Sequence, residues 1–217
     1  MATPQETFHQ TRLKIVAESL KANFFEATAH ETLKDAEDHL LDAIIPSGPY
    51  VSVGFGGSAT VAGSRLLPRL RAAKGLEIVD RNDPKLTADE RFEANRRTLL
   101  ADLFVASSNA VTLDGQLVNV DKFGNRVAAM AFGPRKVALL IGRNKIVEDA
   151  PAGLRRSKAT AASMNALRLG QDTPCAKTAK CYDCKGQNRL CGVVSITQKS
   201  FPPGRIHVLL INEDLGF

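Results

Sequence analysis

Apolar residues are spaced along this chain in two ways, one typical of helices and the other of buried strands. Two stripes with a period of three to four residues lie within residues 1–45, as expected for amphipathic helices. Thr3-x-x-Glu6 and Thr28-x-x-Glu31 have the form of capping boxes, which mark helix starts. We therefore expect a pair of N-terminal helices.

Short apolar runs and helical patterns alternate in the rest of the chain. The clearest run, Lys136–Gly142, is continuously apolar after its first residue, as in a parallel strand covered on both faces. Further strands are expected at 50–54, 76–80, 103–107, 193–197 and 206–211, and helices at 59–70, 87–100 and 152–168. This alternation predicts an α/β fold, with a mainly parallel sheet flanked by helices and residues 1–217 as a single domain.

The composition is that of a folded domain, because 44% of the residues are hydrophobic and can form a packed core. No stretch approaches the roughly 20 apolar residues of a membrane-spanning helix. Residues 1–9 lack the basic and apolar regions of a signal peptide. We expect a soluble cytoplasmic protein without a membrane span, and a homo-oligomer is compatible with the sequence.

The formal net charge of +6 is unevenly distributed. Residues 1–50 hold eight acids and four bases, whereas residues 151–191 hold eight bases and two acids. Tyr182 is the one aromatic residue of the basic segment, so a base-stacking platform for nucleic acid is not expected. A phosphate, an anionic cofactor or an acidic redox partner fits this segment.

All four cysteines of the chain lie within 17 residues, at Cys175, Cys181, Cys184 and Cys191. Four clustered thiolates are the ligands that a structural Zn²⁺ ion or a [4Fe-4S] cluster requires. Basic residues between the cysteines would offset the negative charge of thiolates. We expect residues 170–192 to form a metal-binding or cluster-binding loop, and the spacing does not distinguish the two cofactors.

Two disulfides or four free thiols are the alternatives at this loop. Disulfides are typical of secreted domains, and this chain shows no secretion signal. A chain of 217 residues also buries its own core without covalent staples.

A glycine-rich segment, Gly54–Thr60, joins an expected strand to an expected helix. Gly56 and Gly57 let the backbone approach an anion, and Ser58 and Thr60 add hydroxyl donors near a helix N-terminus. The turn is a candidate cradle for a phosphate or a carboxylate. A tight turn that needs small residues only for packing is the alternative.

A dinucleotide site is a further alternative for the same turn. Gly54-x-Gly56-x-x-Ala59 matches the G-x-G-x-x-A fingerprint, and Asp80 ends the next expected strand, where a ribose-binding acid would lie. A preceding pair of helices is not the usual start of such a fold.

A belt of polar residues follows the strand expected at 103–107. Its members are Asn109, Thr112, Asp114, Asn119, Asp121, Asn125 and Arg126. Because ligands of open α/β sheets bind at the carboxyl ends of strands, we expect Asn109 and Asn125 to bind a ligand. Asp114 or Asp121 could act as a general base, and Arg126 could clamp a carboxylate. Asp-Gly and Gly-Asn pairs are also ordinary turn residues, so a hairpin or irregular strands are expected here.

Several segments resemble the LUD domain family, the lactate-utilisation proteins. They are Gly54–Thr60, Asp102–Gly115, Asn119–Arg126 and Phe132–Val137. The tail Thr173–Cys184 is similar to the stand-alone, cysteine-bearing branch of that family.

The resemblance implies a fold similar to ribose-5-phosphate isomerase, glucosamine-6-phosphate deaminase and the CoA transferases. In those relatives a Gly/Ser/Thr turn after the first strand binds phosphate or carboxylate, and Gly56, Gly57, Ser58 and Thr60 match it here. The resemblance also implies a link to the oxidation of lactate to pyruvate, in which LUD proteins work with iron–sulphur and flavin-type subunits. This chain departs from the multi-domain members because it has no separate two-cluster ferredoxin-like module.

Three functions are therefore carried forward. The first is a redox accessory protein with a cluster in the cysteine loop, a small carboxylate or phosphate ligand and a redox partner protein. The second is a zinc-stapled isomerase, deaminase or CoA-transferase-like enzyme whose chemistry lies in the polar belt. The third is a non-enzymatic ligand sensor or partner-binding module.

Overall fold

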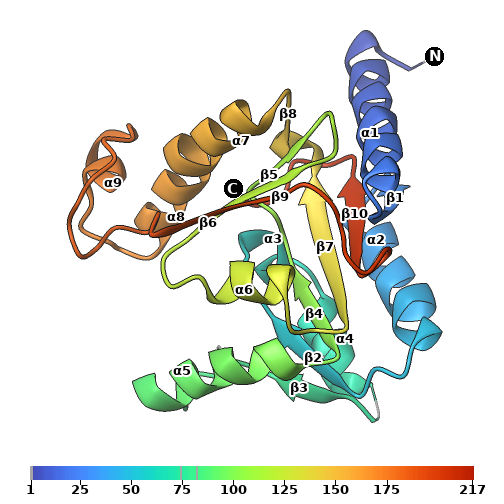
Figure 1. Ribbon diagram of the computed structural model, residues 1–217, viewed down its shortest axis with the longest axis horizontal. Coiled ribbons are helices and arrows are strands. Elements are labelled where there is room, and N and C mark those ends of the chain that lie inside the picture. Colours follow the sequence, from blue (N-terminus) through green and yellow to red (C-terminus); the bar gives the residue numbers. More distant parts are fainter. Residues whose placement is uncertain (1, 74, 82) are drawn as a thin grey trace.

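The computed structural model describes residues 2–73, 75–81 and 83–217, and in this part of the chain two β-sheets are surrounded by helices (Figure 1). The first sheet has six parallel strands in the order β1-β10-β7-β4-β2-β3, and the second has four strands in the order β8-β5-β6-β9. The strands are β1 (Glu26–His30), β2 (Ser52–Phe55), β3 (Glu77–Val79), β4 (Leu103–Ala106), β5 (Ala110–Thr112), β6 (Leu117–Asp121), β7 (Lys136–Gly142), β8 (Ile146–Val147), β9 (Val193–Thr197) and β10 (Ile206–Ile211). The helices are α1 (Pro4–Ala22), α2 (Leu33–His39), α3 (Ala59–Ala62), α4 (Leu66–Ala72), α5 (Ala88–Arg97), α6 (Asn125–Ala131), α7 (Ala150–Arg156), α8 (Ser163–Arg168) and α9 (Pro174–Thr178).

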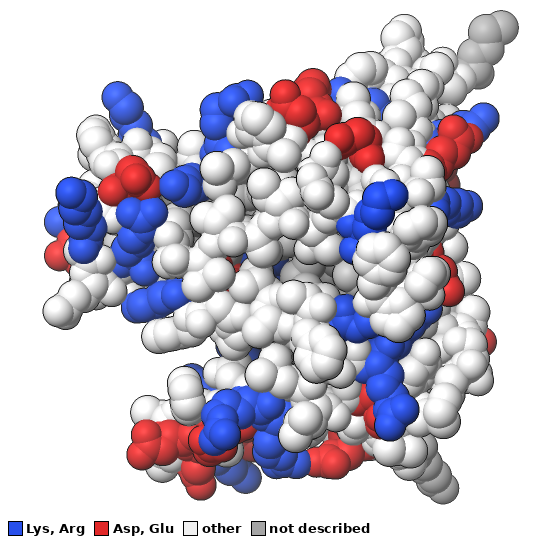
Figure 2. Space-filling model, in the orientation of Figure 1, with Lys and Arg blue, Asp and Glu red and all other residues white. Residues whose placement is uncertain are grey.

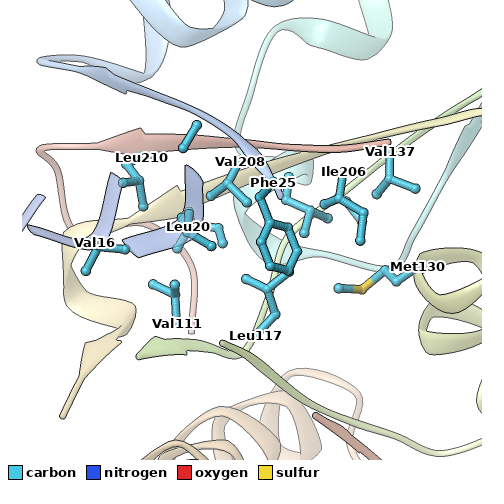
Figure 3. Close-up of a cluster of buried hydrophobic side chains, with 14 of the residues drawn as sticks. Val16, Leu20, Phe25, Val111, Leu117, Met130, Val137, Ile206, Val208 and Leu210 are labelled. Carbon is cyan, nitrogen blue, oxygen red and sulfur yellow. The ribbon is translucent and has the colours of Figure 1, made fainter. Parts of the chain in front are cut away.

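The central strands of the parallel sheet are buried on both faces. In β7, Val137 and Leu139 belong to one core cluster, whereas Ala138 and Leu140 belong to a second cluster with residues of α2, α3 and α4. In the first cluster, shown in Figure 3, side chains of α1, β7 and β10 meet side chains of β5 and β6. The predicted α/β fold with a mainly parallel sheet flanked by helices is confirmed.

The second sheet contains the predicted hairpin. Strands β5 and β6 are antiparallel and are joined by the turn at residues 113–116, and β9 pairs with the other edge of β6. Ala110 and Val118 on this sheet pack with residues of α7. The second sheet therefore lies between the parallel sheet and the α7–α8 helices (Figure 1).

The N-terminal pair of helices is present, but strand β1 lies between α1 and α2 and forms one edge of the parallel sheet. The capping box predicted at Thr28-x-x-Glu31 is wrong, because Thr28 is a strand residue. The N-cap of α2 is Thr32, whose Oγ1 accepts a hydrogen bond from the backbone N–H of Asp35 at 3.2 Å. The capping box at Thr3 is confirmed.

Two further local predictions differ from the structure. The helix predicted over 59–70 is divided into α3 and α4 by a turn at residues 63–65. Helix α6 begins where the sequence shows only turn signals, directly after Gly124, whose φ of 87° is in the left-handed region that glycine adopts without strain. Within the described ranges, no helix combines the length and the apolar character needed to cross a bilayer.

Candidate functional site

Three adjacent strands of the parallel sheet end beside one another. Strand β4 pairs with β2 on one side and with β7 on the other, and parallel strands present their carboxyl ends at one edge of a sheet. The loops that follow, residues 56–58, 107–109 and 143–145, therefore meet. With the β6–α6 loop and α8, they line a cavity of about 250 Å³, which we call the cationic cavity.

Lys145 is the most deeply buried cation of the cationic cavity, at 3% exposure. Its Nζ donates hydrogen bonds to Thr60 Oγ1 at 2.8 Å and to Ser107 Oγ at 2.9 Å. Burial lowers the pKa of Lys145 to about 7, and the charges of Arg156 and Arg126 add to the effect, because both causes disfavour the ammonium form. A substantial fraction of this amine is therefore neutral at pH 7.

Arg126 is buried beside Lys145 but meets a different environment. All five guanidinium N–H groups have acceptors within the protein: Ser107 O, Asn119 Oδ1, Asn109 Oδ1, Val120 O and Asp121 Oδ1, at 2.7 to 3.0 Å. The other carboxylate oxygen of Asp121 accepts from the backbone N–H of Val127, at the start of α6, at 3.0 Å. Arg126 thus ties the end of β4 to β6 and α6.

Three more cations border the cationic cavity: Arg81, Lys122 and Arg168. Arg81 Nη1 donates to Asn95 Oδ1 at 2.9 Å, whereas its Nε is buried and has no hydrogen-bond partner among the described residues. Burial also lowers the pKa of Arg81. Because Asp121 is the acidic side chain of the lining and is already paired with Arg126, the cavity has a positive excess that favours an anionic ligand.

The structure brings together most of the residues proposed from the sequence. Of these, Gly57, Ser58, Asn109, Asp121, Asn125 and Arg126 line the cationic cavity. Thr60 contacts Lys145 just behind the lining. Asp114 lies elsewhere, at the β5–β6 turn, where it accepts hydrogen bonds from Thr112 Oγ1 and from Gln116 Nε2.

The glycines of the turn are explained largely by packing. A Cβ on Gly56 would approach Ala106 Cβ to 2.9 Å and Phe104 to 3.0 Å. A Cβ on Gly57 would meet the Arg81 guanidinium at 2.3 Å, so this glycine leaves room for a cation above the turn. The structure gives no support to a dinucleotide site at this turn, because Asp80, the proposed ribose-binding acid, forms an ion pair with Arg71.

The four cysteines border a second, smaller cavity, which we call the thiol cavity. Cys175, Cys181, Cys184 and Cys191 all line it, each half-buried and none in a disulfide. Among the described residues, however, no three His, Cys, Asp or Glu side chains converge closely enough to hold a single metal ion. The four cysteines thus line one space, and no three of their side chains meet at one point.

Basic side chains fold the cysteine loop. Arg189 Nη1 donates to Cys184 O at 2.7 Å, and its Nε donates to Cys191 O at 2.8 Å. Asp183, with a left-handed φ of 48°, pairs with Arg189 and with Lys158 on the α7–α8 connection. The loop is therefore pinned to the same helices that cover the cationic cavity, and Figure 2 shows the resulting group of basic side chains at this end of the molecule.

The two cavities are neighbours. Ala162, at the end of the α7–α8 connection, and Leu190, next to Cys191, line both of them. A ligand in the cationic cavity is therefore separated from the thiols by a thin wall of side chains.

Sequence reasoning missed Lys145, Arg81 and Arg168 as cavity residues. Lys145 follows the clearest strand of the chain, β7, by three residues, and its position after that strand was the available signal. Arg168 carries no such signal, because only the packing of α8 over the sheet edge brings it to the cavity.

Comparisons with known proteins identify the family of this chain. The family model described as the LUD domain matches residues 13–211. A solved structure, that of a DUF162 family protein from Deinococcus radiodurans, is similar with a TM-score of 0.49 and 13% sequence identity, covering 95% of this chain and 98% of that one. No curated protein matches significantly. Since the family match spans most of its length, the chain belongs to the LUD domain family and is a lactate-utilisation-type protein.

Proposed function

We propose that this protein is a redox accessory protein for the oxidation of lactate or a similar organic acid. The cationic cavity would hold a small carboxylate or phosphate ligand, and the cysteine loop would hold an iron–sulphur cluster. The observation that carries the proposal is the wall formed by Ala162 and Leu190, which places the two cavities side by side. Electron transfer needs this closeness, whereas a purely structural staple does not.

Four cysteines are the donor set of a [4Fe-4S] cluster, which is bound through separate irons, and all four line one cavity here. The same thiolates could hold a structural Zn²⁺ ion, which needs its four sulphurs at about 2.3 Å from one point. Among the described residues no three such side chains meet at one point, so the loop would have to close around either group. Arg189 and Lys158 lie next to the thiols and would offset the negative charge of the cluster, which would supply one-electron transfer.

The cationic cavity supports the ligand half of the proposal. Lys145 has one N–H beyond the two that it donates within the protein, and Arg81 borders the same cavity, so a carboxylate could accept charge-assisted hydrogen bonds from both. Basic residues of the cysteine loop, Lys177, Lys180 and Lys185, would face an acidic redox partner and speed its docking.

Anaerobic purification tests the cluster. We expect iron and acid-labile sulphide in the purified protein, a broad visible absorption band that bleaches on reduction, and loss of all three when the four cysteines are replaced by serine. A colourless protein without iron after anaerobic reconstitution, or one that holds only zinc, would overturn the redox role and leave the zinc-stapled enzyme as the better hypothesis.

A further inference from the structure

We propose that Lys145 is a catalytic residue that forms an imine with a small carbonyl compound bearing a carboxylate or phosphate group. The inference rests on the proposed function in one respect, since it takes the cationic cavity as the ligand site. It goes beyond that function by naming a nucleophile and a class of substrate.

The placement of the amine is the first argument. Lys145 Nζ donates to two hydroxyl oxygens, Thr60 Oγ1 and Ser107 Oγ, and it also lines the cationic cavity. An ammonium group has three N–H donors, so two are used within the protein and one position remains for a ligand. Among the described residues this amine takes part in no ion pair, and its charged neighbours, Arg126 and Arg156, are cations.

The protonation state is the second argument. Only the neutral amine has the lone pair that attacks a carbonyl carbon, and an ordinary lysine is almost wholly protonated at neutral pH. Burial and the neighbouring cations lower the pKa of Lys145 to about 7. The hydroxyls that accept from it when it is protonated can donate to it when it is neutral, because a hydroxyl rotates to either role.

The remaining lining selects the substrate. Arg81 and Arg168 border the same cavity, and guanidinium groups bind carboxylate and phosphate through paired hydrogen bonds. A volume of about 250 Å³ admits a molecule of a few carbon atoms. A small 2-oxo acid, or a short aldehyde phosphate, carries both the anion for the arginines and the carbonyl for the lysine.

The reaction is a condensation and needs no oxidant or reductant. The amine nitrogen forms a bond to the carbonyl carbon, the carbonyl oxygen takes up a proton, and a carbinolamine results. Loss of that oxygen as water, carrying both hydrogens that leave the nitrogen, gives the imine. Thr60 and Ser107 are placed to pass these protons between nitrogen and oxygen.

Reductive trapping tests the proposal on the unmodified protein. The purified chain is incubated with pyruvate, glyoxylate or glyceraldehyde 3-phosphate, reduced with sodium borohydride and digested for mass spectrometry. We expect at least one probe to give a reduced adduct on the peptide that contains Lys145. Glyoxylate and pyruvate adducts would identify a 2-oxo acid site, and a glyceraldehyde 3-phosphate adduct would identify a sugar-phosphate-type site. The absence of an adduct on Lys145 with all three probes would overturn the proposal.

Two variants separate covalent chemistry from simple charge. Lys145→Arg keeps the cation and should lose the adduct, while Lys34→Arg, at an exposed lysine of α2 that pairs with Asp38 and does not line the cavity, should keep it. Labelling that persists at full level on other lysines of Lys145→Arg would mark the wild-type adduct as non-specific and overturn the assignment. Adduct formation is measured independently of iron content. If the protein forms the imine but contains no iron after anaerobic reconstitution, only the redox proposal is contradicted. If it contains iron but forms no adduct, only the imine proposal is contradicted.

Discussion

Two buried cations lie next to each other in this protein, and they are accommodated in opposite ways. Arg126 has an acceptor for each N–H and an ion pair with Asp121, so its charge is compensated. Lys145 has two hydroxyls and no acid. An uncompensated buried charge costs free energy. Arg126 is therefore expected to stabilise the fold, whereas Lys145 is expected to lower the free energy of unfolding.

Replacement of Lys145 by methionine should therefore stabilise the protein at pH 7, by about 1 kcal/mol or more, while weakening ligand binding. Thr60 and Ser107 keep other hydrogen-bond acceptors, Leu215 O and Ser108 O. Urea unfolding of wild type and variant measures the free-energy difference.

The stability difference between wild type and Lys145→Met should also depend on pH. The folded pKa of Lys145, about 7, is below the unfolded value of about 10.4. The unfolded state therefore binds more protons between these values, and wild-type stability should rise with pH across this window. Lys145→Met should lose that rise, so its advantage shrinks from pH 7 to pH 9. A variant that is less stable than wild type at pH 7 would contradict the prediction.

Arg126→Lys should destabilise the fold by about 3 kcal/mol or more, because one ammonium cannot reach the acceptors of a planar guanidinium and leaves buried oxygens unpaired. Arg96→Lys is the matched control, since Arg96 pairs with Glu93 on an exposed face of α5 and should change stability by less than about 0.5 kcal/mol. Equal urea midpoints for the two variants would show that the Arg126 network contributes little.

At the scale of elements, the conformation of a long apolar strand could be predicted from its own sequence, whereas that of short strands and loops depends on the elements packed beside them. Strand β7 was predicted with its full extent, because a continuous apolar run has one stable place in an α/β fold. Strand β1 was missed, since Thr28-x-x-Glu31 has the form of a helix start, and this segment is a strand because β10 pairs with it. The clustering of the four cysteines in one loop was visible in the sequence, but the position of that loop beside the cationic cavity was not, because it depends on how α8 packs.

The edge formed by β1 and β10 holds a buried histidine, His207, that should make the fold acid-sensitive. His207 is buried, its Nε2 lies 3.1 Å from Thr28 Oγ1, and its ring is 5.6 Å from that of His39, which is 5.1 Å from His30. Burial lowers the pKa of His207 to about 4, with Lys136 and His39 acting in the same direction and Glu26 opposing them.

Folding should consequently become less favourable as the pH falls from about 6.5, the unfolded histidine value, towards 4, because the unfolded chain binds protons that the folded chain excludes. His207→Gln should flatten this part of the stability curve. Thermal melts at several pH values between 4 and 7 measure it, and parallel curves for wild type and His207→Gln would contradict the assignment.

The cysteine loop should depend on whatever it binds. Residues 174–192 include no buried residue, so side-chain packing alone does little to hold this segment. Brief trypsin digestion of apo protein should cut at Lys177, Lys180 or Lys185 and leave the sheets intact, and reconstitution with iron and sulphide should slow these cuts at least several-fold. Identical digestion of apo and reconstituted protein would argue against a bound group in the loop.

At the scale of the whole molecule, helix α1 joins the two sheets. Gly115, at the β5–β6 turn, would place a Cβ 2.6 to 2.8 Å from backbone atoms of Ser19 and Leu20, and Asn23 Nδ2 donates to Asp114 O at 2.8 Å. The second sheet is therefore fixed against the helix that covers the first. The sequence showed the glycine as a turn residue, but the close approach that requires it involves residues almost a hundred positions away.

Gly115→Ala should cost more than about 2 kcal/mol, since it combines the left-handed φ of 79° with a backbone clash. Gly170→Ala isolates the first cause, because Gly170 has φ 60° and a Cβ added there would have no neighbouring atom within 4 Å, and it should cost about 1 kcal/mol. Chemical denaturation compares the two. Equal losses would mean that α1 yields easily and that the sheets are joined by other contacts.

The side chains of Ala162 and Leu190 border both cavities. The reactivity of the cysteines could therefore report whether the cationic cavity is occupied. Trimming Leu190 to alanine would open a passage through which an alkylating reagent small enough to enter from the arginine side reaches sulphur. A molecule already seated there would block its path. The rate of cysteine modification in that variant could then identify which compounds the protein accommodates, before any turnover is known.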